Sequence, residues 1–162
     1  MLRAVHAGLL RIFRRLPPAW RLRVVHVLAP TFTVGAICVI DRGDGHVLLV
    51  RHSYRDRWGF PGGLLKKGEE AADGARRETR EEVGLEIELV GEPTVVVAPE
   101  PRRVDIVFRA RPDGDDVDLD ALRPTSPEIL ELRWVPRDDL PELQHEAAGA
   151  LVALARATRA TP

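Results

Sequence analysis

Hydrophobic positions along this chain follow two periods, and the first gives way to the second early in the sequence. Residues 2–16 place apolar side chains three and four positions apart, which predicts a helix. Pro17 and Pro18 interrupt this pattern, and residues 19–28 predict a second, shorter helix. We therefore expect residues 1–30 to form a helical extension that is separate from the rest of the chain.

Beyond this extension the apolar residues follow the pattern of β-strands. Residues 31–40 and 46–53 are rich in β-branched and apolar side chains, and the sequence DRGDG between them is typical of a turn. These two segments predict a hairpin. Three later segments also have strand character: 85–98, 103–110 and 128–135. The polar segments that connect them are predicted loops: 54–63 and 111–127.

Two further segments predict helices that would pack on this sheet. One is rich in glutamate and runs from about Glu69 to Val83, where Gly84 can end it in the left-handed conformation. The other covers residues 141–160, with Pro141 near its start. The order of helices, strands, helix, strands, helix is typical of an α/β layer fold with a mixed sheet, which we expect over residues 31–162.

Charge is divided along the chain in the same way as hydrophobicity. The chain of 162 residues has a formal net charge of −1, yet residues 1–30 contain six arginines and no acidic residue. The apolar side of this extension needs a surface to cover it, so we expect it to pack on its own domain or to form a homodimer with a second copy. An anionic membrane surface is less favoured as a partner. Nucleic acid is the least favoured, because the extension lacks interleaved aromatic residues and a recognisable RNA-binding motif.

Cysteine content and hydropathy favour a cytoplasmic protein. Cys38 is the single cysteine, which excludes an intrachain disulfide, and its apolar neighbours predict a buried thiol. No apolar run reaches the roughly 18–20 residues that a membrane span needs. The N-terminal arginines alternate with apolar residues, whereas a signal peptide has an uninterrupted apolar block.

Three glutamates of the predicted helix share one of its faces. At 100° per residue, Glu78, Glu81 and Glu82 fall within about 100° of arc. The residues before them on that face are small, so the face should be acidic and uncovered. A separate stripe of small and apolar residues can face the sheet: Ala72, Ala75, Thr79 and Val83.

Two interpretations fit this acidic face equally well on helix geometry. In the first, the helix is solvated and stabilised by ion pairs four residues apart, such as Arg77 with Glu81. In the second, the carboxylates bind a hard divalent cation such as Mg²⁺ or Mn²⁺. The second explains why like charges are placed at a spacing that destabilises a helix by a few tenths of a kcal/mol per pair.

This segment and its flanks resemble the Nudix box, whose pattern is Gly-x5-Glu-x7-Arg-Glu-U-x-Glu-Glu-x-Gly-U, with U an aliphatic residue. The positions of the pattern are occupied here by Gly63, Glu69, Arg77, Glu78, Thr79, Glu81, Glu82, Gly84 and Leu85. Thr79 departs from the pattern, since the family has a bulky aliphatic residue there. The resemblance extends loosely over about residues 31–160 and implies the family's α/β/α sandwich.

The resemblance also implies an activity. Nudix enzymes use a divalent metal ion to hydrolyse compounds in which a nucleoside diphosphate is linked to another moiety. The expected small-molecule substrate is therefore a nucleotide sugar, an ADP-ribose-like compound or a nucleoside triphosphate. Two alternatives stay open: a nucleotide-sensing module that does not hydrolyse its ligand, and a pyrophosphohydrolase that acts on RNA 5′ ends.

The metal site is implied by the same resemblance. Glu81 and Glu82 would be the principal ligands of Mg²⁺ or Mn²⁺, and Glu78 would be a ligand or the base that takes a proton from water. Gly63 belongs to the tight turn whose backbone would approach the metal.

The remaining box residues would support this site. Arg77 would form an ion pair with Glu69 and so tie the preceding loop to the helix, and Gly84 would end the helix.

Four residues outside the box are further candidates. Some family members take their base from a downstream loop, for which Glu100 and Glu128 are the candidates here. Tyr54 and Trp58 precede the box and are candidates for stacking on a nucleobase.

Overall fold

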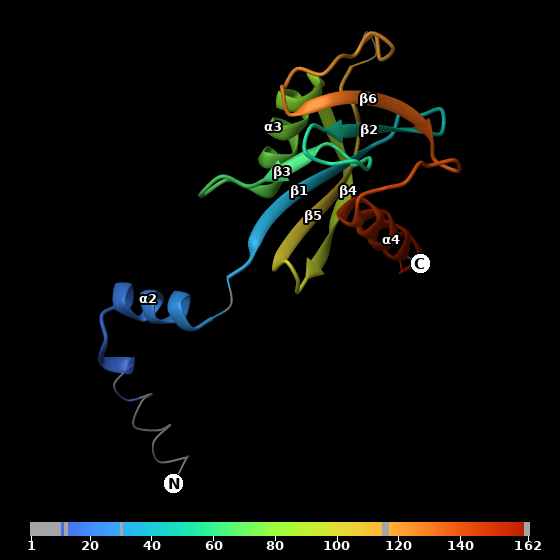
Figure 1. Cartoon of the computed structure of the whole chain (residues 1–162). Helices are drawn as coiled ribbons and strands as arrows, with labels where there is room; N and C mark the ends of the chain where they lie inside the picture. Colours follow the sequence, from blue (N-terminus) through green and yellow to red (C-terminus); the bar gives the residue numbers. More distant parts are fainter. Residues whose placement is uncertain (1–10, 12, 30, 115–116, 161–162) are drawn as a thin grey trace. The chain divides into compact units, whose positions relative to one another are not determined.

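The computed structural model describes residues 11, 13–29, 31–114 and 117–160, and the chain divides into two compact units, 1–32 and 33–162 (Figure 1). The first unit contains helix α2 (Pro18–Leu28), with Pro17 at its N-cap. Pro18 is the first residue of this helix, and proline suits that position because the N–H of the first helical residue has no partner within the helix. This confirms the predicted second helix, whereas the predicted helix over 2–16 lies mostly outside the described residues.

The second unit contains, within the described residues, six strands in two sheets. The larger sheet has the order β3-β1-β5-β4, in which β1 runs parallel to β5 and the other neighbours are antiparallel. The smaller sheet pairs β2 with β6 in the antiparallel direction. The strands are β1 (Thr33–Ile40), β2 (His46–His52), β3 (Gly62–Leu64), β4 (Ile87–Ala98), β5 (Arg103–Pro112) and β6 (Ile129–Pro136).

The strands form the middle layer between helices α3 (Ala71–Val83) and α4 (His145–Ala160) (Figure 1). Successive side chains of a strand point to opposite faces, so β1 and β2 contribute to two apolar clusters. The cluster with α3 contains Ala36, Cys38, Leu48, Val50, Ala75 and Val83, and the cluster with α4 contains Ile37, Val39, Val47, Leu49, Ala147 and Ala150. This arrangement confirms the predicted α/β/α sandwich with a mixed sheet.

Helix α3 packs on the sheet through the stripe of small and apolar residues that the sequence predicted. Ala75, Thr79 and Val83 are fully buried against the sheet. The Thr79 hydroxyl donates a 2.9 Å hydrogen bond to the carbonyl of Ala75, which satisfies the polar group where the family has an aliphatic residue. Gly84 ends the helix with φ of 68°, as predicted from its position.

Cys38 is buried in the core on the α3 side, as predicted. Burial raises the pKa of its thiol to about 12. The thiolate is the reactive form, so Cys38 is a packing residue and not a nucleophile at neutral pH.

The predicted hairpin is correct at its turn and wrong in its pairing. Arg42 N–H donates to the carbonyl of His46, and Asp41 forms an isolated bridge with Val47. Beyond this turn β1 and β2 part, because β1 already has β3 and β5 on its two sides and β2 pairs with β6. The local sequence encodes the turn, but the strand partners come from distant segments.

Three boundaries also differ from those predicted. Strand β3 begins within the segment 54–63, which the sequence predicted to be a loop. Two of its three residues are glycines, which is why no strand was predicted there. Strand β4 begins at Ile87, two residues later than predicted, and its pairing with β5 shifts register between Val90 and Thr94. Helix α4 begins at His145, and Pro141 precedes it in the connecting segment.

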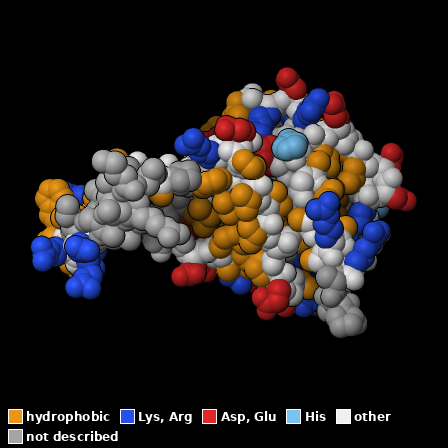
Figure 2. Space-filling view, turned by 90° about the horizontal axis from the view of Figure 1, so that it is seen from below, with side chains coloured by type: hydrophobic (Ala, Val, Ile, Leu, Met, Phe, Trp, Pro, Cys, Tyr) orange, Lys and Arg blue, Asp and Glu red, His pale blue; other side chains and the backbone are white. Residues whose placement is uncertain are grey.

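The surface of the second unit leaves part of the sheet exposed. Figure 2 shows apolar side chains gathered on one face of this unit, and the exposed large apolar residues include Val34 on β1 and Val95 and Val97 on β4. In the part of the chain that the structure describes, no helix has the length and apolar character required to cross a membrane.

Candidate active site

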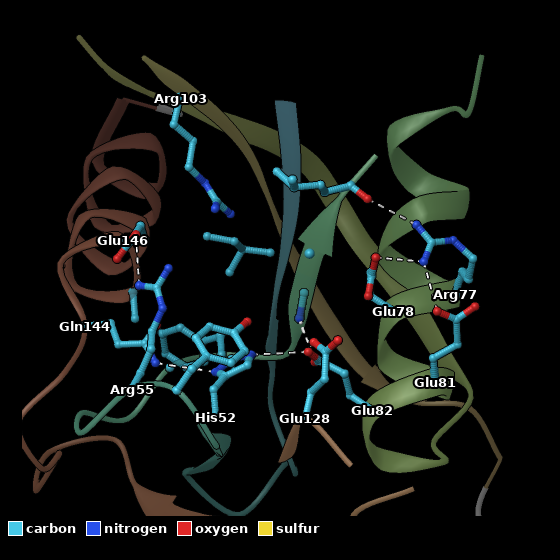
Figure 3. Close-up of a pocket in the computed structure, with 18 of the residues that line it drawn as sticks. His52, Arg55, Arg77, Glu78, Glu81, Glu82, Arg103, Glu128, Gln144 and Glu146 are labelled. Carbon is cyan, nitrogen blue, oxygen red and sulfur yellow. Dashed lines mark hydrogen bonds and ion pairs between the residues drawn. The ribbon is translucent and has the colours of Figure 1, made fainter. Parts of the chain in front are cut away.

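A cavity of about 480 Å³ opens between α3 and α4 (Figure 3). The glycines of β3 line it, and charged side chains line both of its sides. Figure 3 shows Glu78, Glu81 and Glu82 together with Arg77 on the α3 side, and Arg55 and Arg103 on the α4 side, where Arg55 pairs with Glu146 at 3.0 Å. We call one set of lining residues the carboxylate wall (Glu78, Glu81, Glu82 and Glu128) and another the arginine wall (Arg55 and Arg103).

Glu82 is the buried member of the carboxylate wall, with 6% of its surface exposed. The N–H of Gly62 donates a 3.0 Å hydrogen bond to its Oε2 atom, and Nε2 of His52 lies 3.3 Å from its Oε1 atom. Both carboxylate oxygens therefore have a polar partner. A buried carboxylate needs such partners, since removing a charge from water is costly.

Arg77 connects the other carboxylates of α3. Its Nε atom donates to Glu69 Oε1 at 2.6 Å and its Nη2 atom to Glu69 Oε2 at 2.9 Å, which is the predicted ion pair in bidentate form. Its Nη1 atom donates to Glu78 Oε1 at 2.7 Å and to Glu81 Oε2 at 3.0 Å. Glu69 also accepts a 2.7 Å hydrogen bond from the N–H of Lys66, which ties the loop after β3 to α3.

These contacts and burial shift the pKa values of the glutamates in different directions. The hydrogen bonds from Arg77 lower the pKa of Glu69 to about 2. Burial raises the pKa of Glu78, in spite of its contact with Arg77. For Glu81, the removal of water raises the pKa, but the charges of Arg77 and Lys66 outweigh it and the net direction is downward.

The sequence predicted that the acidic face of α3 would be uncovered. That prediction is wrong, because other groups contact all three glutamates. Arg77 extends along the helix and contacts Glu78 and Glu81, and β3 and His52 cover Glu82. The contacts of Glu82 come from other elements, so a projection of the helix alone cannot show them.

Two adjacent glycines allow the helix to approach the sheet this closely. A Cβ atom on Gly63 would lie 2.6 Å from Cδ of Glu78, so the absent side chain leaves space for that carboxylate. A Cβ atom on Gly62 would lie 2.2 Å from the carbonyl oxygen of Ala36 on β1. Gly63 thus shapes the cavity, and Gly62 allows β3 to pair with β1.

The donor atoms of the carboxylate wall fit a hard divalent cation. Glu78, Glu81 and Glu82 present carboxylate oxygens to one cavity, and Mg²⁺ and Mn²⁺ prefer oxygen ligands. Among the described residues, no group of three His, Cys, Asp or Glu side chains is arranged to hold a metal ion as it stands. Arg77 contacts oxygens of Glu78 and Glu81, so these carboxylates would exchange that partner for a cation.

Comparison with known proteins identifies the family of this fold and site. The model of the NUDIX domain matches residues 31–155. The chain belongs to the NUDIX family. It is therefore a hydrolase of pyrophosphate bonds, and NUDIX hydrolases generally use divalent metal ions.

Individual NUDIX relatives agree with this assignment. A MutT-like protein of Streptomyces ambofaciens is 33% identical over 118 residues, which cover 72% of this chain and 72% of that protein. An RNA pyrophosphohydrolase of Erythrobacter litoralis is 30% identical over 105 residues, or 53% of this chain and 63% of that protein. A solved NUDIX hydrolase from Nitrosomonas europaea is 26% identical with a TM-score of 0.67, covering 82% of this chain and 76% of that chain.

The structure separates the candidates outside the NUDIX box. Glu128 lines the cavity on the carboxylate wall, whereas Glu100 lies in the turn between β4 and β5 and does not line it. Tyr54 lines the cavity with its ring 5.3 Å from that of His52. Trp58 does not line it, because its ring packs against the α4 core and under the guanidinium of Arg133. Of these four residues, Glu128 therefore remains a candidate for the base, and Tyr54 remains a candidate for stacking on a nucleobase.

The residues of this site that sequence reasoning missed include His52, Gln144 and the two arginines of the arginine wall. His52 ends β2, two residues after Val50 in the α3-side cluster, and this alternation was a usable signal. No local signal marks Gln144 or Arg103, since both reach the cavity through contacts between distant segments.

Proposed function

We propose that this NUDIX protein is a Mg²⁺- or Mn²⁺-dependent pyrophosphohydrolase that cleaves a nucleoside diphosphate linked to another moiety. The observation that carries the proposal is one cavity in which three box carboxylates of α3 face an arginine wall. Such a cavity suits a substrate that arrives with phosphates and a cation between them. Its volume of about 480 Å³ is within the range of small-ligand sites.

In this proposal each wall has its own task. Glu81 and Glu82 hold the cation, which when bound offsets charge on the phosphates and lowers the pKa of a bound water. Glu78 or Glu128 accepts the proton of the attacking water. Arg103 and Lys66 contact phosphate oxygens, and Tyr54 at the rim stacks on the base.

A substrate panel tests the proposal. The purified protein is incubated with ADP-ribose, nucleotide sugars, dinucleoside polyphosphates, nucleoside triphosphates and 5′-triphosphorylated RNA, with Mg²⁺, with Mn²⁺ and with a chelator. We expect metal-dependent cleavage of a pyrophosphate bond in one of the small molecules. Preferred cleavage of the RNA would support the alternative that the Erythrobacter relative suggests. Tight nucleotide binding without a product would contradict the proposal and favour a sensor.

Arg103 offers a separate test of the arginine wall. Its Nε atom donates to both carboxylate oxygens of Asp105, at 2.7 and 2.9 Å, and Asp105 is 3% exposed. A Cβ atom on Gly35 would lie 2.6 Å from Asp105, so glycine makes room for the pair. Figure 3 shows the guanidinium pointing into the cavity.

Replacing Arg103 by methionine should therefore raise KM by roughly ten- to a hundredfold, because a charge-assisted hydrogen bond to a phosphate contributes about 1.5–3 kcal/mol. The measurement is steady-state kinetics on the best substrate of the panel. Arg111→Met is the matched control, since Arg111 is on the same strand and pairs with Glu88 on the surface. An unchanged KM for Arg103→Met would exclude contact between Arg103 and the substrate.

A further inference from the structure

A buried row of three polar side chains connects the start of α4 with Glu82. Gln144 precedes α4, His52 ends β2, and Glu82 is on α3. The Nε2 atom of Gln144 lies 3.4 Å from Nδ1 of His52, and Nε2 of His52 lies 3.3 Å from Oε1 of Glu82 (Figure 3). All three residues are at most 9% exposed, and each lies within hydrogen-bonding distance of the next.

The orientation of the Gln144 amide follows from a fourth group. Its Nε2 atom is 2.9 Å from the carbonyl oxygen of Arg57. A carbonyl oxygen can only accept a hydrogen bond, so the amide must present its NH₂ group there. The second hydrogen of the same NH₂ group is then available for Nδ1 of His52.

This orientation determines the proton position on His52. Nδ1 faces a donor and must act as an acceptor, so it carries no proton. A neutral imidazole has one N–H, which is then on Nε2 and points at Glu82. Gln144 is itself held closely, because a Cβ atom on Gly59 would lie 3.1 Å from its amide.

We propose that His52 is a positioning residue for the metal site, with its tautomer set by Gln144. It donates its Nε2–H to Oε1 of Glu82 while Gly62 donates to Oε2, and the two bonds fix the orientation of this carboxylate at the cavity. This inference rests on the proposed function in one respect, the role of Glu82 as a ligand. Partners of metal ligands act in this way, and their loss typically reduces metal affinity or activity by about 10–100-fold.

The tautomer is tested first on the unaltered protein, without metal. Nitrogen-15 NMR of the imidazole distinguishes the two neutral tautomers and the imidazolium. We expect His52 to carry its proton on Nε2 at neutral pH and to shift toward Nδ1–H in Gln144→Met. A proton on Nδ1 in the unaltered protein would overturn the proposal.

The effect on the metal site is tested by Mn²⁺ affinity, measured from the EPR signal of free Mn²⁺. We expect His52→Leu to weaken Mn²⁺ binding by about 10–100-fold. His52→Gln should restore most of it, because the glutamine amide can place an N–H near the position of Nε2. His46→Leu is the matched control, since His46 is a partly exposed histidine on the same strand and pairs with Asp44.

Two further outcomes separate this inference from the proposed function. If Glu82→Gln loses Mn²⁺ binding but His52→Leu and Gln144→Met keep it, the role of His52 is wrong and the proposed function stands. If Glu82→Gln binds Mn²⁺ like the unaltered protein, both are wrong. A loss of kcat at unchanged KM in His52→Leu, recovered in His52→Gln, would support positioning rather than substrate contact.

Discussion

Replacing Glu82 by glutamine should reduce turnover by on the order of 10³-fold while the domain stays folded. Removing an outer partner of a metal ligand typically costs about 10–100-fold, and removing the ligand itself should cost more. Glutamine has the same shape, but it has one acceptor where Glu82 has two. Either Gly62 or His52 then faces an NH₂ group in place of an oxygen.

The stability cost of this change should be limited. One buried donor without a partner costs about 1–3 kcal/mol, which a domain with a typical stability of about 5–15 kcal/mol can sustain. Turnover and thermal unfolding are measured together, and Glu88→Gln serves as the control because Glu88 pairs with Arg111 on the exposed surface. Turnover of Glu82→Gln within a few fold of the unaltered enzyme would remove Glu82 from the catalytic site.

Replacing either glycine of β3 by alanine should have a different effect on stability. Gly62→Ala should destabilise the fold, whereas Gly63→Ala should leave the stability nearly unchanged. Gly62→Ala places a Cβ atom 2.2 Å from the backbone carbonyl of Ala36 and 2.9 Å from Cα of Ile37. Backbone atoms of the central strand cannot move aside without disturbing its pairing with β5. Gly62 also has φ of 147°, a conformation that side chains rarely adopt. We expect a loss of about 3 kcal/mol or more in the free energy of unfolding.

Gly63→Ala is the matched control for this prediction. Its Cβ atom would meet the carboxylate end of Glu78, which can rotate away. The variant should therefore unfold close to the unaltered protein but lose activity, because Glu78 leaves its position in the cavity. Urea unfolding and kinetics on both variants check the contrast. Equal stability of Gly62→Ala and the unaltered protein would show that β3 does not approach β1 as described.

The sequence was most informative where structure depends on neighbouring residues. The stripe of Ala75, Thr79 and Val83 follows from helical spacing alone, and the conformation of Gly84 follows from its place at the end of α3. The resemblance to the Nudix box also implied the contact between Arg77 and Glu69, which the structure contains.

The parts that the sequence did not reveal depend on contacts between distant segments. The pairing of β2 with β6 joins residues about 80 positions apart, and no local pattern identifies such a partner. His52 contacts Glu82, and Gln144 contacts His52, through segments that are 30 and 92 positions apart in the chain. The spacing of four residues also indicated the contact between Arg77 and Glu81, whereas the contact between Arg77 and the adjacent Glu78 was not predicted.

The origin of the product oxygen tests the central claim most directly. The best substrate of the panel is hydrolysed in water enriched in oxygen-18, with Mg²⁺ or Mn²⁺ and with a chelator, and the phosphate products are followed by phosphorus-31 NMR. We expect one oxygen-18 atom in one phosphate product, formed only when the metal is present, because water attacks a phosphorus atom of the pyrophosphate. Turnover that is equally fast with the chelator, or products without oxygen-18 on phosphorus, would contradict metal-dependent pyrophosphate hydrolysis in this cavity.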